Sequence, residues 1–294
     1  MKNHLITPVG PYSLASVADF SPGRCGPAMR ADPPPDDGVV RAAFPLDGDW
    51  RTVGVRITQA SADGDVLVSS VGAPSGRAVG SVVARALGLD IDSTPLRGIA
   101  RRDTVVRQPL RERPGFRPRG FWSPYEAAVW AVLAQRTTQA HAVSVSAWLA
   151  TAHGEAVTVD GRVLLAAPTP EALATTRHVP GIPKVKVDRL RAVAVAAEEG
   201  VLDGARLRSL DVEVARKELS EISGLGPFSV DLVLMRGAQH PDVWSPNEPV
   251  LHRVIRERYG LDPDGLLSEV EAVVARWQPL RSWVGVLLRS AEAR

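Results

Sequence analysis

The spacing of apolar residues changes character along the chain. Near the N-terminal end they alternate with other residues, as where Val53, Val55 and Ile57 are separated by Gly54 and Arg56. A period of two is typical of a strand with one buried and one solvated face. Similar apolar runs flank this one, and a turn signal precedes the last of them. The pattern therefore predicts three strands, over 39–46, 50–58 and 66–70.

From residue 121 onwards the apolar residues instead recur every three or four positions. Ser123-Pro-Tyr-Glu126 begins a helix, with Ser as N-cap, Pro at the first helical position and Glu at the third. Apolar residues then line one face of that helix. Further helices are expected at 78–89, 138–152, 169–176, 184–199, 212–221, 228–238, 249–258, 266–277 and 280–292. The predicted fold class is α+β, with a β-rich α+β domain over 1–95, an Arg-rich linker over 96–122 and an all-helical domain over 123–294.

The segment between the two predicted domains is rich in arginine. It holds eight arginines against only two acidic residues, Asp103 and Glu112. Two interpretations stay open, a solvated linker or a strip that faces DNA. The arginines are Arg97, Arg101, Arg102, Arg107, Arg111, Arg113, Arg117 and Arg119.

Composition sets limits on the class of protein. With 294 residues, 45% of them apolar and 23% charged, the chain can form a substantial core and is not intrinsically disordered. A net charge of +2 excludes a strongly basic tail but allows a basic face. Cys25 is the only cysteine, which excludes an intrachain disulfide and a cysteine zinc cluster. Without a membrane-length apolar run or a signal-peptide pattern, we expect a soluble protein of a reducing compartment.

Residues 218–234 form the most informative stretch. A predicted helix ends at Gly224-Leu-Gly226, and a second helix starts directly after it. Two glycines around one apolar residue allow a tight hairpin and let a foreign backbone come close. Backbone N–H groups at the start of the second helix suit a phosphate. An ordinary turn between two packed helices is the alternative.

Several motifs, in order along most of the chain, resemble one family. The chain is similar to the helix-hairpin-helix DNA glycosylases, in particular to the bacterial 3-methyladenine DNA glycosylase II branch. The hairpin is one of these motifs, and Ser223 replaces the usual Pro before its first glycine. The others are Pro11–Leu14, Pro114–Pro118, Ser123–Gln135, Val179–Lys186, Asp242–Pro249 and Arg276–Trp283.

The resemblance implies a monofunctional DNA N-glycosylase of base excision repair. Such enzymes flip a damaged nucleotide out of the duplex and hydrolyse its N-glycosidic bond through an oxocarbenium-like transition state. The catalytic carboxylate would be Glu248, which aligns with an Asp of the family. Phe228 stands where bifunctional relatives have a nucleophilic Lys, so no Schiff base is expected. The alternative is a catalytically altered protein of the same fold that binds damaged or distorted duplex DNA.

The resemblance also implies roles for other residues. Phe228, Leu232, Leu280 and Tyr125 would form the base pocket, although Leu232 and Leu280 stand where the family has Tyr and Trp. DNA would be bound by Gly224, Leu225, Gly226, Ser229, Gln135 and Arg136, with Arg136 in the place of an apolar wedge. Backbone carbonyls of Ser220, Ile222 and Leu225 would hold a monovalent cation. Asp231 and His252 are expected to be structural or rim residues.

The remaining expectations concern partners and location. The resemblance implies no organic cofactor and no catalytic metal. The expected partner is duplex DNA with damaged bases, bound by a monomer in the bacterial cytoplasm, with no membrane involved.

Overall fold

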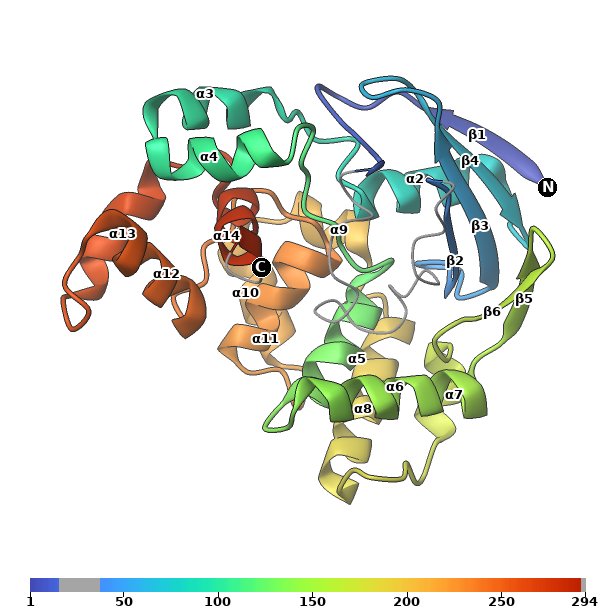
Figure 1. Ribbon diagram of the computed structural model, residues 1–294. Coiled ribbons are helices and arrows are strands. Elements are labelled where there is room, and N and C mark those ends of the chain that lie inside the picture. Colours follow the sequence, from blue (N-terminus) through green and yellow to red (C-terminus); the bar gives the residue numbers. More distant parts are fainter. Residues whose placement is uncertain (16–37, 292–294) are drawn as a thin grey trace.

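The N-terminal part of the molecule is an antiparallel sheet. The computed structural model describes residues 1–15 and 38–291, so Cys25 lies outside the described residues. The sheet has the strand order β1-β4-β3-β2, formed by β1 (Lys2–Ile6), β2 (Val40–Pro45), β3 (Thr52–Gln59) and β4 (Val66–Val71) (Figure 1). The three strands predicted from alternation are confirmed. Strand β1 was not predicted, because a five-residue, mostly exposed edge strand lacks a clear apolar alternation.

The alternation along strand β3 predicts that one of its faces is solvated, but the structure covers that face. A hairpin of β5 (Ala156–Val159) and β6 (Arg162–Leu165) from the helical part lies against it. A Cβ on Gly54 would stand only 2.5 Å from a methyl of Val159, so glycine is needed there for the two to pack. Arg56 pairs with Asp160 of the hairpin turn at 2.9 Å. The prediction of a wet face is thus wrong, because a segment a hundred residues away covers it.

Helices make up most of the rest of the structure, and those predicted from periodicity are confirmed within a few residues. The region 123–294 is not all-helical as predicted, because the β5–β6 hairpin lies within it, and its two four-residue strands are too short to show a clear apolar pattern. The stretch 228–238 is helical throughout, but its last turn is π-helical (Val233–Gly237). No helix among the described residues is long and apolar enough to cross a membrane. The helices are α2 (Gly76–Ala86), α5 (Pro124–Ala134), α6 (Gln139–His153), α7 (Pro170–Thr175), α8 (Lys184–Glu198), α9 (Gly204–Ser209), α10 (Val212–Ser220), α11 (Pro227–Leu232), α12 (Pro249–Tyr259), α13 (Leu267–Ala275) and α14 (Arg281–Ala291).

The Arg-rich segment needs a correction. Instead of a linker it contains two helices, α3 (Thr94–Arg102) and α4 (Thr104–Glu112). Asp103 joins them: its carboxylate caps α4 and also accepts hydrogen bonds from Tyr259 and Trp277. Apolar residues of both helices, Leu96, Ile99 and Val106 among them, are buried beside α12–α14. The sequence missed these helices because the arginines on their outer faces obscure a narrow apolar stripe.

Arg117 contacts residues near both ends of the chain. Its buried guanidinium donates hydrogen bonds to several backbone carbonyls, including those of Val9 and Ile91. It also lies over the rings of Tyr12 and Trp283, 5.6 Å from each centroid. Burial lowers the pKa of Arg117 to about 10, which leaves it charged at neutral pH. The motifs near Pro11, Pro114 and Trp283, distant in sequence, therefore meet at one residue.

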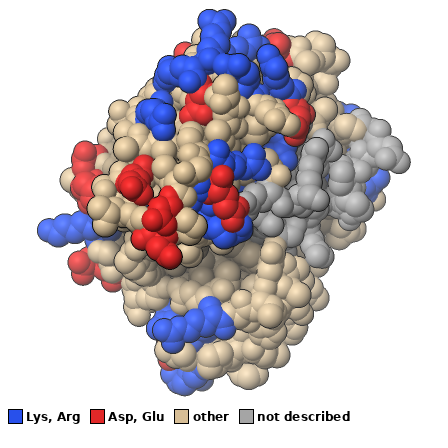
Figure 2. Space-filling model, turned by 60° about the vertical axis from the view of Figure 1, so that its left-hand side comes forward, with Lys and Arg blue, Asp and Glu red and all other residues tan. Residues whose placement is uncertain are grey.

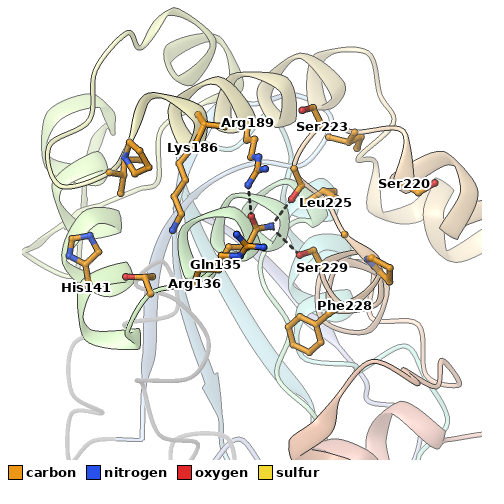
Figure 3. Close-up of a pocket in the computed structure, with 18 of the residues that line it drawn as sticks. Gln135, Arg136, His141, Lys186, Arg189, Ser220, Ser223, Leu225, Phe228 and Ser229 are labelled. Atoms are coloured by element: carbon orange, nitrogen blue, oxygen red, sulfur yellow. Dashed lines mark hydrogen bonds between the residues drawn. The ribbon is translucent and has the colours of Figure 1, made fainter.

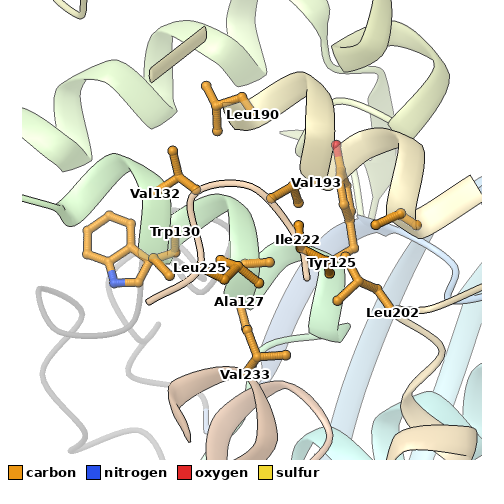
Figure 4. Close-up of a cluster of buried hydrophobic side chains, with 14 of the residues drawn as sticks. Tyr125, Ala127, Trp130, Val132, Leu190, Val193, Leu202, Ile222, Leu225 and Val233 are labelled. Carbon is orange, nitrogen blue, oxygen red and sulfur yellow. The ribbon is translucent and has the colours of Figure 1, made fainter. Parts of the chain in front are cut away.

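Helix α5 is the centre of the helical part. Residues of α8 and of the turn between α10 and α11 surround it, and Figure 4 shows Ala127 and Val132 of α5 among Leu190, Val193 and Leu225. Nearly every residue of α5 is buried. Because the helix is packed on all sides, its C-terminal end at Gln135 is held at a defined place, and the candidate site lies there.

Candidate functional site

The two glycines of the α10–α11 turn have different local requirements. Gly224 has φ = 99°, and a Cβ on it would lie 2.7 Å from Cγ of Arg189. Gly226 has φ = −83°, and a Cβ on it would meet nothing within 4 Å. The fold itself therefore needs glycine at 224, whereas Gly226 leaves open space in front of the hairpin.

A groove of about 910 Å³ runs along this open side. The hairpin forms one wall, and the start of α8 with the loop after α5 forms the other (Figure 3). Arg136, Lys186 and Arg189 line it, and no acidic residue does. Burial, followed by the nearby Arg189, lowers the pKa of Lys186, whose Nζ donates to the Leu133 carbonyl at 2.9 Å. The groove is electropositive and suits a polyanion.

Gln135 connects the two walls. Its Nε2 donates to the Gly224 carbonyl at 2.6 Å and to Ser229 Oγ at 3.4 Å, while its Oε1 accepts from Arg189 Nη1 at 3.1 Å (Figure 3). The next residue, Arg136, is exposed and has φ = 48°. A non-glycine residue in this left-handed region costs about 1–2 kcal/mol. The Gln135 hydrogen bonds hold the loop against the hairpin, and Arg136 lines the groove directly after it.

A second cavity of about 630 Å³ adjoins the groove, and five residues line both: Gln135, Arg136, Thr137, Phe228 and Ser229. Glu248 lies on its wall, at the N-terminus of α12, with only 8% of its side chain exposed. Its Oε2 accepts a hydrogen bond from Arg289 Nη1 of α14 at 2.5 Å. A buried carboxylate held by one guanidinium is oriented as well as neutralised.

The segment that carries Glu248 is anchored to the hairpin helices through Arg216 of α10. Arg216 Nε pairs with Asp231 Oδ1 of α11 at 2.9 Å, and its Nη2 donates to the Trp244 carbonyl at 2.6 Å. Asp231 thus has the structural role expected of it. His252 stacks on Trp244, with ring centroids 5.2 Å apart, and does not line the cavity.

The aromatic surface of the cavity differs from the one expected. Phe228, 40% exposed, and Leu232 line the cavity, as the resemblance implied. Trp130 of α5 and Trp244 also line it. The sequence does not distinguish either tryptophan, because apolar spacing alone does not separate a residue facing a cavity from one facing the core.

Two residues assigned to the base pocket lie elsewhere. Tyr125 is buried at the far end of α5, where its hydroxyl donates to the Pro168 carbonyl at 3.1 Å. Ten residues of helix, about 15 Å, separate it from Gln135. Leu280 is buried in the core beside α12–α14 and does not line the cavity. Both predictions are corrected: these residues pack the protein interior.

The residues expected to hold a cation are close together. Ser220, Ile222 and Leu225 all line the groove, and the Ile222 carbonyl accepts one hydrogen bond, from Leu225 N–H at 3.0 Å. A carbonyl has two lone pairs, so its oxygen retains capacity for a ligand. The site is therefore compatible with a monovalent cation held by carbonyls. The described residues contain no cluster of three or more His, Cys, Asp or Glu side chains that could hold a metal ion.

Comparisons with known proteins point in the same direction. The sequence is 26% identical over 199 residues to a DNA-3-methyladenine glycosylase of Bacillus subtilis, a match that covers 66% of each chain. It is 31% identical over 176 residues to DNA-3-methyladenine glycosylase 2 of Escherichia coli, covering 58% of each chain. The matches thus span less than two thirds of these relatives. No family model matches the sequence.

The fold has a close counterpart among solved structures. The 3-methyladenine DNA-glycosylase from Archaeoglobus fulgidus superposes with a TM-score of 0.79 at 20% identity, covering 100% of this chain and 98% of the other. The match is therefore not confined to the helical part of the chain. The chain therefore has the fold of the helix-hairpin-helix DNA glycosylase superfamily and resembles bacterial 3-methyladenine DNA glycosylase II.

Proposed function

We propose that this protein is a monofunctional DNA N-glycosylase of base excision repair, which removes an alkylated or otherwise damaged purine. One observation carries the proposal: a buried, oriented carboxylate, Glu248, lies on the wall of a cavity that opens beside an electropositive hairpin groove. The groove would bind the DNA backbone and the cavity would receive a flipped base. The names of the curated relatives support this class of substrate.

Glu248 would act on the sugar. As the bond between C1′ and the base nitrogen breaks, the base leaves with the electron pair and positive charge grows on the sugar. A nearby carboxylate stabilises that charge and orients the water whose oxygen bonds to C1′, while the water proton passes to the carboxylate or to solvent. Arg289 fixes one oxygen of Glu248, so the side chain, one methylene longer than Asp, still has a defined position.

The product would be an intact strand with an abasic site. Phe228 has no amine, and Lys186, which lines the adjoining groove, donates its Nζ to a backbone carbonyl instead. Without an amine at position 228, no Schiff base with the sugar would form there and the strand would stay uncut.

Arg136 and the hairpin would hold the distorted duplex. A guanidinium on the wall shared by groove and cavity can stack in the gap that the flipped base leaves, or hydrogen-bond the orphaned partner base. A monovalent cation on the carbonyls of Ser220, Ile222 and Leu225 would add a positive charge at the hairpin, and no organic cofactor is part of the proposal.

The proposal is tested by base release from duplexes that carry 3-methyladenine, 7-methylguanine, ethenoadenine or hypoxanthine. Wild type and Glu248→Gln are compared, with alkali used to reveal abasic sites. We expect release by wild type and a decrease of about 100-fold or more in the variant. Strand cleavage before alkali would contradict monofunctional chemistry. No release from any of these lesions would contradict the glycosylase assignment for them.

A second function is favoured by the same ion pair. Arg289 neutralises the negative charge of Glu248. Catalysis needs that charge to stabilise the sugar, whereas a protein of this fold that only binds damaged or distorted duplexes does not need it. Both functions predict duplex binding that weakens steeply with salt. Turnover separates the two functions. Tight duplex binding by both wild type and Glu248→Gln, without base release by either protein, would establish the binding function.

A further inference from the structure

The outer face of α3 and α4 is a second strongly basic surface, which we call the arginine face. Arg97, Arg101, Arg102 and Arg111 are exposed on it, and Arg107 is half-buried between them. Five arginines within fifteen residues are a marked concentration in a chain whose net charge is only +2. Figure 2 shows the corresponding blue surface at the top of the molecule.

These charges are not neutralised by neighbouring acids. Arg102 and Arg107 donate to backbone carbonyls, those of Arg276 and of Ala100 and Arg101, which orient the guanidinium groups without cancelling their charge. The two helices and their junction contain two acids. Asp103 is buried and its carboxylate caps α4, and Glu112 is the last residue of α4. No ion pair found among the described residues involves the arginine face.

The chemistry of the face favours duplex DNA over other partners. No large apolar side chain is exposed between residues 94 and 113, so a protein partner would find no hydrophobic anchor there. No aromatic residue is present in this range on which the bases of a single strand could stack. What the face offers is five guanidinium groups, two of them oriented by backbone carbonyls, which is suited to a row of phosphates.

Acidic side chains separate the arginine face from the hairpin groove. Helices α12 and α13 and the loop between them expose five acids, and Figure 2 shows red side chains below the blue top of the molecule and above its hollow. Glu257 and Glu269 pair with Arg253 and Arg256, so a straight duplex engaged at the groove would meet three acids without an ion pair among the described residues before it reached the arginine face. The acids are Glu257, Asp262, Asp264, Glu269 and Glu271.

We propose that the arginine face is a second DNA site, which binds a segment of duplex other than the one held at the hairpin. Two sites on one monomer let the protein hold one segment while it engages another, which would speed the transfer between segments during a search. This site is independent of base removal, because no residue of it lines the groove or the cavity beside Glu248.

The test measures binding of a second duplex. Wild type is first saturated with a short unlabelled duplex that contains an abasic-site analogue, and a longer, labelled, lesion-free duplex is then titrated in. The test variant carries Arg97→Gln, Arg101→Gln and Arg111→Gln together. The matched control carries Arg77→Gln, Arg177→Gln and Arg258→Gln, which removes the same charge from three separate surfaces.

We expect the preloaded wild type and control to bind the labelled duplex, and the test variant to bind it at least about 10-fold more weakly. For each phosphate that the variant no longer neutralises, the slope of log K against log salt should become shallower by about 0.9. Base release from a short lesion-bearing duplex should be the same for all three proteins. Equal second-duplex binding by test variant and control would overturn the proposal, as would tighter binding of a labelled single strand titrated in place of the duplex. Second-duplex binding by a wild type that releases no base would contradict only the glycosylase function.

Discussion

The hairpin groove and the adjoining cavity share residues but are built by different means. The groove depends on backbone geometry and on one amide side chain: Gly224 takes a positive φ, and Gln135 links the hairpin to the opposite wall. The cavity depends on side chains: Glu248 with its Arg289 partner, and the rings of Trp130, Trp244 and Phe228.

The same difference separates two kinds of departure from the family that the sequence resembles. A backbone-built groove tolerates new side chains, such as Ser223 in place of Pro or Arg136 in place of an apolar residue, as long as Gly224 is kept. A side-chain-built cavity changes its selectivity with each substitution, and Glu248 and Leu232 are both departures that line it. We therefore expect DNA binding to be conventional for this fold and base selectivity to be specific to this chain.

The largest effect should come from Arg289→Gln, which acts on the cavity alone. Removing the guanidinium leaves Glu248 buried without its counter-charge and free to move, and a displacement of about 1 Å can lower a rate about 100-fold. Base release should fall by that factor in kcat, with duplex affinity retained.

The control for this variant is Arg253→Gln. Arg253 pairs with Glu257 on the exposed side of α12, where both side chains are more than half exposed. Its replacement should leave base release unchanged. If Arg289→Gln lowered base release by a further 100-fold in a protein that already carries Glu248→Gln, then Arg289 would act in some way other than through Glu248.

The groove is tested by replacing each hairpin glycine with alanine. Gly224→Ala should lower the free energy of unfolding by about 1–2 kcal/mol, because of its positive φ and the collision with Arg189.

Gly226→Ala should change stability by less than about 0.5 kcal/mol. Its new methyl group enters the open space before the hairpin and should prevent one charge-assisted hydrogen bond to a phosphate, which weakens binding by about 1.5 kcal/mol or roughly 10-fold in Kd. Thermal unfolding and duplex titration measure both effects.

The informative case is Gly226→Ala, which should separate binding from stability. If this variant binds duplex as wild type does, then the DNA backbone does not approach the hairpin where the groove is open. Catalysis at saturating duplex should be retained, because the cavity beside Glu248 is untouched.

Local patterns predicted those parts of the molecule that depend on neighbours in sequence. The alternation around Val55, the capping box at Ser123 and the helix–turn–helix around Gly224 are all local, and the structure has strands, a helix and a hairpin there. By contrast, the β5–β6 hairpin covers Gly54 from a hundred residues away, and nothing in the periodicity of either segment indicates the contact.

The candidate site shows the same division. The structure places Glu248 on the cavity wall, yet its partner Arg289 is 41 residues away, and the pattern of α14 shows only an ordinary amphipathic helix. Trp130 lies within the Ser123–Gln135 motif, where its sequence context is simply that of a buried helix. Which face of a fully buried helix borders a cavity depends on the packing of other elements, so only the structure could show it.

A smaller effect is expected where groove and cavity meet. Arg136→Gly removes the guanidinium but suits the left-handed backbone at this position, so the relieved strain offsets the added flexibility of the unfolded chain. Stability should change by less than about 1 kcal/mol. Base release should fall about 5-fold, as expected when one stacking interaction of about 1 kcal/mol is removed. Arg136→Leu should restore much of that rate if the residue acts as a wedge, and unchanged release by Arg136→Gly would remove Arg136 from the site.

The last comparison is between two buried carboxylates, and here no effect on base release is expected. Burial raises the pKa of Glu126, on α5, to about 8, with the Trp122 N–H opposing part of the shift. Since this exceeds the unfolded value of 4.5, the contribution of Glu126 to stability is complete below pH 4.5 and is lost as the pH rises towards 8. Glu126→Gln cannot titrate, so its unfolding temperature should match that of wild type at low pH and exceed it increasingly up to pH 8. Glu257→Gln, on the surface, should show no such trend. If the difference in unfolding temperature between Glu126→Gln and wild type did not depend on pH, Glu126 would be ionised in the native protein. If Glu126→Gln lowered base release, Glu126 would contribute to catalysis as Glu248 is proposed to do.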